Sequence, residues 1–368
     1  MRIGLCGGGQ LAQMLSLAGH PLGLRCVAYA QDAGDPACAV GAFELGGWDD
    51  DDALDRFAAR VDLVTFEFEN VPRRAVERLA ARVPVRPSIE ALDTAADRVS
   101  EKSLFRRLGI GTAPFEAVDS QADLVRALAS IGLPAVLKTR RMGYDGKGQK
   151  VLRAPGDVQS AFAELGGHPC ILEGFVPFRR ELSVVGVRGL NGEVAVYPLF
   201  ENRHRDGVLR VSTSPALCSP SLEAEAHRAM RAVLEALDYV GVLAVELFEI
   251  EGGLLANEMA PRVHNSAHLT SEGHETSQFE NHLRAVAGWP LGSTRPLGHA
   301  GMVNLLGAVP DAATGSGAGS VLAVEGAHVH LYGKAPRPGR KVGHVTVRAA
   351  DAAARDAALA RVVALLGA

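Results

Sequence analysis

The sequence has little of several features that mark large classes of protein. Aromatic residues make up only 5% of its 368 residues, and its five cysteines form no C-x-x-C pair. No run of about 18 apolar residues occurs. These absences argue against a membrane-spanning protein, a disulfide framework and a cysteine zinc site, so we expect a reduced, cytoplasmic protein without a membrane partner.

Charge of one sign is also lacking. The chain has 38 Lys and Arg residues against 42 Asp and Glu residues, for a net charge of −4. A dedicated nucleic-acid binder needs a broad positive field, which this balance does not provide. We therefore expect no nucleic-acid partner, and any anion site must be local.

What is present is a composition typical of a globular protein, with 47% hydrophobic and 22% charged residues. At roughly 150 residues per domain, the length indicates two or three domains. The first segment alternates predicted strands with helices, at residues 2–6, 10–17, 24–30, 63–68 and 72–82. This alternation predicts a parallel α/β sheet, in which ligands bind outside the carboxyl ends of the strands. Residues 7–10 and 67–70 would both lie there.

From about Asp93 the pattern changes to a largely antiparallel α+β arrangement. It begins with a predicted helix over residues 95–108 and a glycine-rich loop over residues 140–150. Further helices are predicted at residues 222–237 and 351–366. The predicted strands lie at residues 134–139, 170–175, 181–187, 194–199, 241–248, 254–259, 302–306, 329–332 and 344–348. Segment 288–296 is typical of a linker, and residues 312–320 of a loop.

The most informative stretch is a predicted β-hairpin over residues 242–258. If it closes through a three-residue loop at 251–253, Glu246 stands directly opposite Glu258. Opposed side chains have Cβ atoms about 5 Å apart, and two carboxylates at that distance need a neutralising partner. Mg²⁺, which uses one or two carboxylates plus substrate phosphates, would provide it. The alternative is that one glutamate is protonated or pairs with an arginine such as Arg262.

Two further segments offer contacts to phosphate. Lys138 ends an apolar strand and precedes a loop with glycines at Gly143, Gly146 and Gly148, whose N–H groups could approach phosphate oxygens. The loop lacks the Walker A spacing, and an exposed basic turn is the alternative. Residues 332–341 hold four cations within eight residues, which suits a phosphate monoester or a solvated turn.

The first glycines leave a different chemistry open. Gly7-x-Gly9-x-x-Ala12 fits the dinucleotide fingerprint, and Asp32 follows the second predicted strand. This keeps a nicotinamide-dependent oxidoreductase possible, although that activity would leave the glutamate pair and the basic turn without a role. A strand–turn–helix unit can also bind a simple phosphate at the helix N-terminus.

The polar segment 258–268 indicates a substrate pocket next to the hairpin. Within and beyond it, His264, His268, Glu272 and His274 could form a transition-metal site. The order H-E-x-x-H is absent, and capping or surface histidines are the alternative.

Five motifs, in order along nearly the whole chain, resemble those of the N5-carboxyaminoimidazole ribonucleotide synthases, ATP-grasp enzymes of bacterial and fungal purine synthesis. The motifs are Gly7-Gly8-Gly9-Gln10-Leu11, residues 65–72 (TFEFENVP), residues 143–148 (GYDGKG), residues 257–262 (NEMAPR) and Tyr332-Gly333-Lys334. The resemblance implies a three-domain ATP-grasp fold that combines α/β and α+β parts. Its expected bounds are an N-terminal parallel-sheet (preATP-grasp) domain over 1–92, an ATP-grasp domain over 93–290 with a lid subdomain at about 112–175, and a small C-terminal α+β domain over 291–368.

The same resemblance implies an activity. ATP, bicarbonate and 5-aminoimidazole ribonucleotide (AIR) would give N5-carboxyaminoimidazole ribonucleotide, ADP and phosphate, with two Mg²⁺ ions bound and usually in a homodimer. Bicarbonate oxygen would attack the γ-phosphate to give carboxyphosphate, which breaks down to CO₂ in a site closed by the glycine loop. A formate-dependent glycinamide ribonucleotide transformylase would share the ATP residues but use another acceptor, and a module that binds nucleotide without catalysis is a further alternative.

Carried over by motif, the resemblance also implies site residues. The implied ATP contacts are Arg98, Lys138, Gly143, Tyr144, Asp145, Gly146, Lys147, Gly148, Gln149, Glu173, Gly174, Phe175, Val176, Glu181, His204, Asn257 and Glu258. The implied AIR contacts are Glu69, Tyr144, Asp145 and Lys147, with Lys334 and Arg340 at its phosphate. Glu246 and Glu258 match the metal ligands, in agreement with the hairpin register. Lys138, Arg262, His264 and Asn265 are the implied catalytic residues, the last three in the pocket that activates bicarbonate.

Two positions depart from the family pattern. Met142 stands where the family often has Gly, and Val263 stands where Pro is usual between the Arg and the His. Neither change removes a functional group. His264 could orient bicarbonate, orient the carbonyl or move a proton, and the sequence does not choose among these roles.

Overall fold

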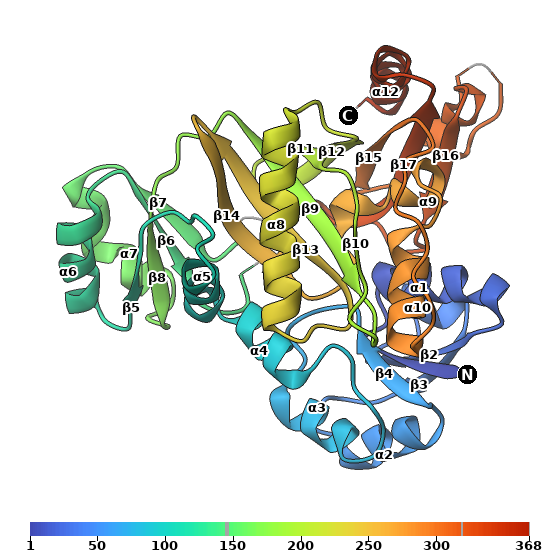
Figure 1. The fold of residues 1–368 in the computed structure, drawn as a ribbon, viewed down its shortest axis with the longest axis horizontal. Helices are drawn as coiled ribbons and strands as arrows, with labels where there is room; N and C mark the ends of the chain where they lie inside the picture. The colour runs from blue at the N-terminus through green and yellow to red at the C-terminus, as the bar shows by residue number, and fades with distance from the viewer. Residues whose placement is uncertain (144–146, 318, 368) are drawn as a thin grey trace.

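The computed structural model describes residues 1–143, 147–317 and 319–367, whose strands form three sheets (Figure 1). The first sheet is parallel, in the order β3-β2-β1-β4. Its strands are β1 (Arg2–Cys6), β2 (Arg25–Ala30), β3 (Ala42–Leu45) and β4 (Leu63–Phe66), with helices α1 (Gln10–Gly19), α2 (Asp51–Ala59) and α3 (Arg73–Ala80) and 3-10 turns η1 (His20–Leu22) and η2 (Pro36–Ala39). This confirms the predicted α/β start.

A small antiparallel sheet, in the order β5-β8-β6-β7, lies at one end of the molecule (left in Figure 1). Its elements are β5 (Phe115–Val118), β6 (Ala135–Thr139), β7 (Gln149–Leu152), β8 (Cys170–Gly174), α6 (Gln121–Ile131), α7 (Val158–Glu164) and η3 (Pro155–Asp157). The two helices pack on the sheet around Val118, Leu137 and Leu172, and this apolar cluster is separate from the others. The unit lies within the range 112–175 given for the lid, whose role stays a prediction.

The central sheet follows the order β14-β13-β9-β11-β12-β15-β17-β16, with β10 beside β9. Its strands are β9 (Arg180–Arg188), β10 (Val194–Val196), β11 (Phe200–Arg205), β12 (Val208–Ser214), β13 (Gly241–Ile250), β14 (Gly253–Ala260), β15 (His299–Leu306), β16 (Ala327–Leu331) and β17 (Lys341–Ala349). The remaining elements are α4 (Ile89–Ala96), α5 (Arg98–Arg107), α8 (Pro220–Ala236), η4 (Asn265–Ala267), α9 (Thr270–Gly273), α10 (Gln278–Ala287), α11 (Asp311–Thr314), η5 (Val321–Ala323) and α12 (Ala352–Leu366). Because β12 pairs with β15, the C-terminal strands extend this sheet. The domain boundaries given above stay predictions.

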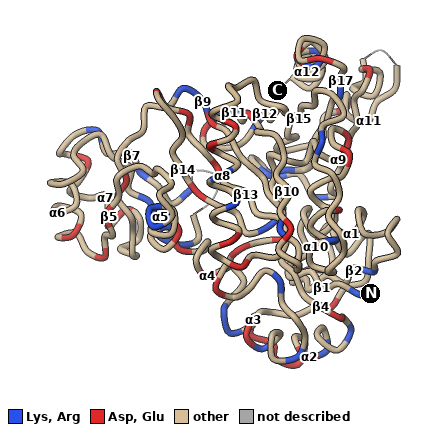
Figure 2. Tube along the Cα trace, in the orientation of Figure 1, with Lys and Arg blue, Asp and Glu red and all other residues tan. Residues whose placement is uncertain are grey.

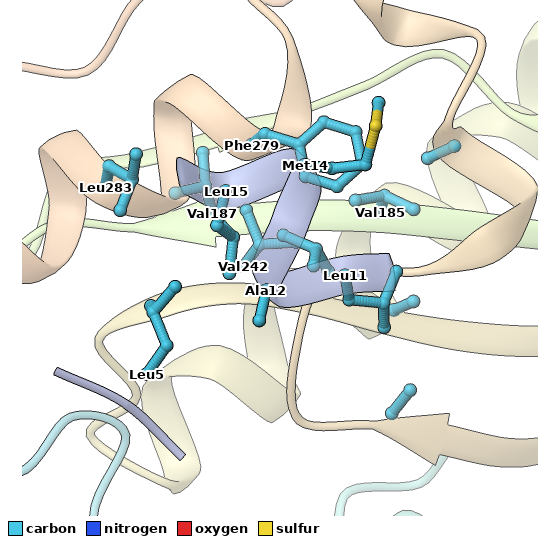
Figure 3. Close-up of a cluster of buried hydrophobic side chains, with 14 of the residues drawn as sticks. Leu5, Leu11, Ala12, Met14, Leu15, Val185, Val187, Val242, Phe279 and Leu283 are labelled. Carbon is cyan, nitrogen blue, oxygen red and sulfur yellow. The ribbon is translucent and has the colours of Figure 1, made fainter. Parts of the chain in front are cut away.

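Helix α1 joins the N-terminal sheet to the central one. Its apolar residues Leu11 and Leu15 belong to one buried cluster with Val187 of β9, Val242 of β13 and Leu283 of α10. Figure 3 shows these side chains meeting between α1, the central strands and α10. The N-terminal sheet and the central sheet therefore share a hydrophobic core.

The structure differs from the sequence prediction at one functional helix. The helix expected over 95–108 is two helices, α4 and α5, because Asp97 has extended backbone angles and its carboxylate caps α5 through the N–H groups of Val99 and Ser100. The same carboxylate pairs with Arg140 and Arg141 at the start of the glycine loop. Asp97 thus ends one helix, starts the next and anchors the loop.

Other expectations were incomplete. Strands β3, β5, β7, β11 and β12 and helices α2, α6, α7, α9 and α10 were not predicted, and the segment 312–320, predicted as a loop, begins inside helix α11. The sequence of β11 (FENRHR) lacks the alternation of apolar and polar residues that marks a strand. Its side chains Asn202 and His204 are instead hydrogen-bonded to residues of β9. None of the helices described is long and apolar enough to cross a membrane.

Candidate active site

The central feature of the site is the hairpin of β13 and β14, where Glu246 stands directly opposite Glu258 as predicted. The predicted loop, however, is wrong: Ile250 pairs with Gly253, so the turn has two residues, Glu251 and Gly252. A bulge between Glu246 and Leu247 shifts the register by one and restores the predicted pairing. The extra residue is Asn257, and such bulges re-aim side chains beside active sites.

Arginine does pair with one of the two glutamates, but it is not the arginine suggested by the sequence. Arg98 at the start of α5 donates to Glu258 at 2.5 Å. Although burial alone would raise the pKa of Glu258, Arg98 holds it well below its usual range. Arg262 instead donates to both carboxylate oxygens of Glu69, at 2.7 and 3.2 Å. Glu258 is therefore ionised.

Two cavities meet at this glutamate pair. One, of about 410 Å³, lies toward the N-terminal sheet, and the other, of about 310 Å³, lies between the small sheet and the central sheet. Both are lined by Arg98, Glu246, Glu258, His264, Asn265 and Lys341. Figure 2 shows that acidic and basic residues are otherwise spread over the whole chain, so the charge relevant here is local.

The cavity beside the small sheet collects most of the residues implied as ATP contacts. Those lining it are Arg98, Lys138, Lys147, Gln149, Glu173, Gly174, Phe175, Val176, Glu181, His204, Asn257 and Glu258. Gly143 lines the other cavity and Gly148 lines neither of the two, whereas Tyr144, Asp145 and Gly146 lie outside the described residues. The cavity wall includes the stacked rings of Phe178 and Phe248, 4.6 Å apart, which suit a flat aromatic group.

Charge within this cavity is held in pairs. Lys138 donates to Glu173 at 3.0 Å, and Glu181 accepts from His204 at 2.7 Å. Burial alone would lower the pKa of His204, but the hydrogen bond to Glu181 raises it overall. Met142, at the start of the glycine loop, has a φ of 64°, a left-handed conformation that glycine adopts without strain and that other residues rarely adopt.

The other cavity contains only part of the set implied for AIR. Glu69 lines it, paired with Arg262, while Lys334 and Arg340 are not among its lining residues. Lys334 reaches its edge, because its ammonium donates to the side chain of the lining residue Gln10. Arg340 donates to Ala335 O at 3.2 Å within the basic turn. The structure thus places Lys334 at the rim of this cavity and leaves Arg340 in the basic turn, close enough for its charge to act on Lys334.

The glycine motif of α1 holds a carboxylate of the chain itself. Glu67 accepts from the N–H of Gly9 at 2.6 Å and from that of Ala12 at 3.1 Å. A Cβ atom on Gly9 would lie 2.6 Å from Glu67 Oε1, so the glycine makes room for this side chain. Because Glu67 occupies the anion position at the helix N-terminus, the dinucleotide interpretation is wrong.

The transition-metal alternative is also wrong. His264 contacts Glu246, whereas Glu272 pairs with His330, and His268 packs against Phe279. Across residues 1–143, 147–317 and 319–367, no group of three or more His, Cys, Asp or Glu side chains could hold a metal ion. In the polar segment after β14, His264 and Asn265 line both cavities, Arg262 lines the larger one and Ser266 the smaller one.

Sequence reasoning missed several groups in the site. Lys102, which is 1% exposed, lies 3.2 Å from Glu173 and donates to Asn257 O at 3.0 Å. The carboxylate of Glu101 accepts from the N–H of Met259, and burial raises its pKa. Both residues stand on a helix with no local pattern to mark them, whereas Lys341, which lines both cavities, belongs to the basic run already noted.

Three family models match consecutive parts of the chain. They are a ribonucleotide synthetase preATP-grasp domain over residues 1–96, an ATP-grasp domain over residues 103–279 and a phosphoribosylaminoimidazole carboxylase C-terminal domain over residues 300–358. The fold that holds the two cavities is that of an ATP-grasp enzyme.

Similar proteins narrow this class. The chain is 56% identical over 368 residues to the N5-carboxyaminoimidazole ribonucleotide synthase of Pseudomonas aeruginosa, covering 100% of this chain and 99% of that one. With the synthase of Bacillus subtilis it shares 39% identity over 348 residues, 94% of this chain and 90% of that one. The chain belongs to the N5-carboxyaminoimidazole ribonucleotide synthase family, the ATP-dependent ligases that carboxylate AIR in purine biosynthesis.

Solved structures of family members have the same fold as this chain. The synthetase of Thermus thermophilus superposes with a TM-score of 0.94 at 52% identity, covering 100% of this chain and 99% of that chain. The Aspergillus clavatus synthase in complex with ADP and 5-aminoimidazole ribonucleotide gives a TM-score of 0.89 at 30% identity, with 100% and 97% covered.

Proposed function

We propose that the cavity beside the small sheet binds ATP, that the cavity beside the N-terminal sheet binds AIR, and that bicarbonate is activated where they meet. The observation that carries this proposal is the side chain of Asn265, whose Oδ1 and Nδ2 are both buried at the junction without a hydrogen-bond partner in the described part of the chain. Buried amides nearly always have partners, so this one fits a small polar ligand. The complex of the Aspergillus clavatus relative with ADP and AIR supports the choice of ligands.

On the ATP side, the chain supplies an apolar wall and charged ends. The backbone of Phe175 and Val176 would meet the adenine, because the Glu173 side chain already serves Lys138 and Lys102. Glu181, held by His204, would accept from the ribose hydroxyls. Lys138 and the N–H groups of residues 143–149 would hold phosphate oxygens.

Glu246 and Glu258 would hold Mg²⁺, of which the family resemblance implies two ions. The donor set fits, since both carboxylates lie on one face of the hairpin and line both cavities. Bound there, Mg²⁺ would neutralise and orient the triphosphate oxygens. Arg98, which now neutralises Glu258, would turn toward phosphate when the metal takes its place.

In the reaction, a bicarbonate oxygen forms a bond to the γ-phosphorus while the bond from that phosphorus to the β-bridging oxygen breaks, releasing ADP. The carboxyphosphate splits into CO₂ and phosphate, and the exocyclic amine of AIR adds to CO₂ and loses a proton. Arg262 and Lys138 supply positive charge where anionic oxygens gather, and Asn265 orients bicarbonate by hydrogen bonds. Excluding water preserves carboxyphosphate, which is a role for the glycine loop.

The experiment that tests this function measures ADP release with AIR, bicarbonate, both or neither, and detects the carboxylated product by mass. We expect full turnover only when both are present. Glycinamide ribonucleotide in place of AIR should not support turnover, and if it did so better than AIR, the proposed acceptor would be wrong.

A cytoplasmic homodimer also belongs to this proposal. β3 is an edge strand with Phe43 and Leu45 exposed, and sedimentation would measure the assembly.

The basic turn gives a selective prediction. We expect Arg340→Ala to raise the KM for AIR about tenfold or more, because one charge-assisted contact to the phosphate is lost, and to change the KM for ATP less than about twofold. Arg337→Ala, in the same exposed turn, is the matched control and should leave both constants unchanged. Equal effects of Arg340→Ala on the two substrates would contradict the assignment.

Lys334 predicts a pH dependence. Burial, together with the charges of Arg340 and Lys341, lowers the pKa of its ammonium to about 8, and Glu67 and Asp35 oppose the shift. The ammonium is charged below that pH and loses its charge above it. At saturating ATP, kcat/KM for AIR should therefore fall as the pH rises through about 8, and Lys334→Arg should remove the fall. At saturating AIR, kcat/KM for ATP should not show this limb.

A further inference from the structure

A chain of buried polar side chains runs across the central sheet and ends at His264. It begins at Ser212 on β12 and passes through Asn202 on β11, Ser183 on β9 and Ser266 in η4. The three serines are 0% exposed and Asn202 is 4% exposed. Burying four polar groups is costly unless each is hydrogen-bonded. These four are hydrogen-bonded to one another in sequence, and we therefore asked what this order does at His264.

The direction of the hydrogen bonds can be assigned from the His264 end of the chain, where one donor is a backbone N–H. The backbone N–H of Ser266 can only donate, and it lies 3.4 Å from Nδ1 of His264, so Nδ1 accepts. The hydroxyl of Ser266, 2.8 Å from the same nitrogen, then also donates to it. In a neutral imidazole the other nitrogen, Nε2, must carry the proton.

The rest of the chain agrees with this direction. Asn202 donates through Nδ2 to Ser183 Oγ at 2.9 Å, which leaves the Ser183 hydroxyl free to donate to Ser266 Oγ at 2.8 Å. Ser212 donates to Asn202 Oδ1 at 2.5 Å. Each link therefore has one donor and one acceptor, and all protons point toward His264.

We propose that Ser183, Asn202, Ser212 and Ser266 are positioning residues that fix the tautomer of His264, with its proton on Nε2. That nitrogen lies 3.3 Å from Glu246 Oε1 and faces the junction of the two cavities. His264 is therefore presented as a hydrogen-bond donor to an oxygen of bicarbonate or carboxyphosphate, and not as a base that takes a proton at Nε2. This inference rests on the proposed function only for the identity of that oxygen.

The position of the chain in the sheet supports this role. Ser183 is paired directly with Glu246 across β9 and β13, so the serine and the glutamate lie on the same face of the sheet. Asn202 is likewise paired with both Ser212 and Glu181. The same rows of residues that carry the acidic groups of the site therefore carry the hydrogen-bond chain.

The wild-type protein provides the first test, by ¹⁵N–¹H correlation of the imidazole rings with ¹⁵N-labelled histidine. Recorded at about pH 8, where an ordinary imidazole is neutral, the spectrum should show His264 with its proton on Nε2. His264→Gln identifies the signal among the twelve histidines. A proton on Nδ1 would overturn the proposal, whether or not the enzyme is active with AIR and bicarbonate.

A polarity-reversing variant provides the second test. Asn202→Asp is nearly isosteric but can only accept, so the hydroxyl of Ser183 turns toward it and the hydroxyl of Ser266 turns toward Ser183. Nδ1 of His264 then faces an acceptor at 2.8 Å and keeps only the longer 3.4 Å contact from the N–H of Ser266, which favours a proton on Nδ1. We expect the proton to move to Nδ1 and kcat to fall about tenfold, with the KM for ATP changed less than about twofold. An unchanged tautomer together with an unchanged kcat would overturn the proposal.

The chain offers a matched control on the same strand. Ser214 is 0% exposed, as is Ser212, but its hydroxyl has no partner in the described structure. Ser214→Ala should leave the tautomer and kcat as in the wild type, whereas Ser212→Ala and Ser183→Ala should give both tautomers and a lower kcat. If Asn202→Asp shows no cooperative thermal unfolding, Ser183→Ala replaces it as the test. A Ser183→Ala variant with the wild-type tautomer and kcat, as expected for Ser214→Ala, would then overturn the proposal.

Discussion

Glu258→Gln is expected to lower the rate of ADP formation at least about a thousandfold, equivalent to about 4 kcal/mol of transition-state stabilisation. Glutamine keeps the size of the side chain but not its charge. The variant would leave Arg98 without the carboxylate it contacts at 2.5 Å and would leave Glu246 as the only carboxylate of the pair. The measurement is ADP release in a coupled assay, with Mg²⁺ binding followed by calorimetry.

Glu251→Gln is the matched control, because Glu251 lies in the exposed turn of the same hairpin and away from both cavities. It should show the turnover and Mg²⁺ affinity of the wild type. Normal ADP formation by Glu258→Gln would refute the role given to the glutamate pair. Loss of activity with unchanged Mg²⁺ binding would restrict Glu258 to its contact with Arg98.

The largest expected effect on stability comes from Lys102→Met. Lys102 and Glu173 are 1% and 3% exposed, and the ammonium also satisfies the carbonyl of Asn257. Lys102→Met leaves the carbonyl of Asn257 without this donor and leaves Glu173 with Lys138 as its remaining cation. Breaking a buried ion pair typically costs about 3 to 5 kcal/mol. We therefore expect the free energy of unfolding, measured with urea, to fall by that amount.

Lys150→Met is the control for that variant. Lys150 also pairs with a glutamate, Glu164, but their side chains are 26% and 50% exposed. Exposed pairs contribute about 1 kcal/mol or less, so this variant should be nearly neutral. If the two variants lost equal stability, burial would not be the cause of the effect at Lys102.

How far the site could be predicted from the sequence is clearest at the hairpin. The pairing of Glu246 with Glu258 was predicted correctly although the turn was not, because the one-residue error in the loop is offset by the bulge at Asn257. A bulge leaves little trace in the alternation of side chains, so the sequence could not reveal it. Counting residues from the turn predicted which glutamates face each other, but it did not predict the bulge in the backbone between them.

The parts that escaped prediction depend on contacts between distant segments. Lys102 stands on a helix whose pattern does not distinguish it from exposed lysines, and only the fold brings it to Glu173 and Asn257. Helix α5 starts later than expected because Asp97 caps it rather than continuing the turn before it. Strand β11 was missed because its inward residue Asn202 is polar, and a partner on another strand is what makes its burial favourable.

The position of α1 has a mechanical consequence. Since this helix is packed into the apolar layer between the N-terminal sheet and the central one, moving those two sheets apart would expose side chains such as Leu15 and Leu283 to water (Figure 3). The β5–β8 unit has its own apolar interior, so its movement would not open that layer and would act instead on polar contacts such as the pair of Glu173 with Lys102. We therefore expect opening and closing around the proposed ATP cavity to be a hinge movement of that unit, against a body that keeps the proposed AIR cavity in place.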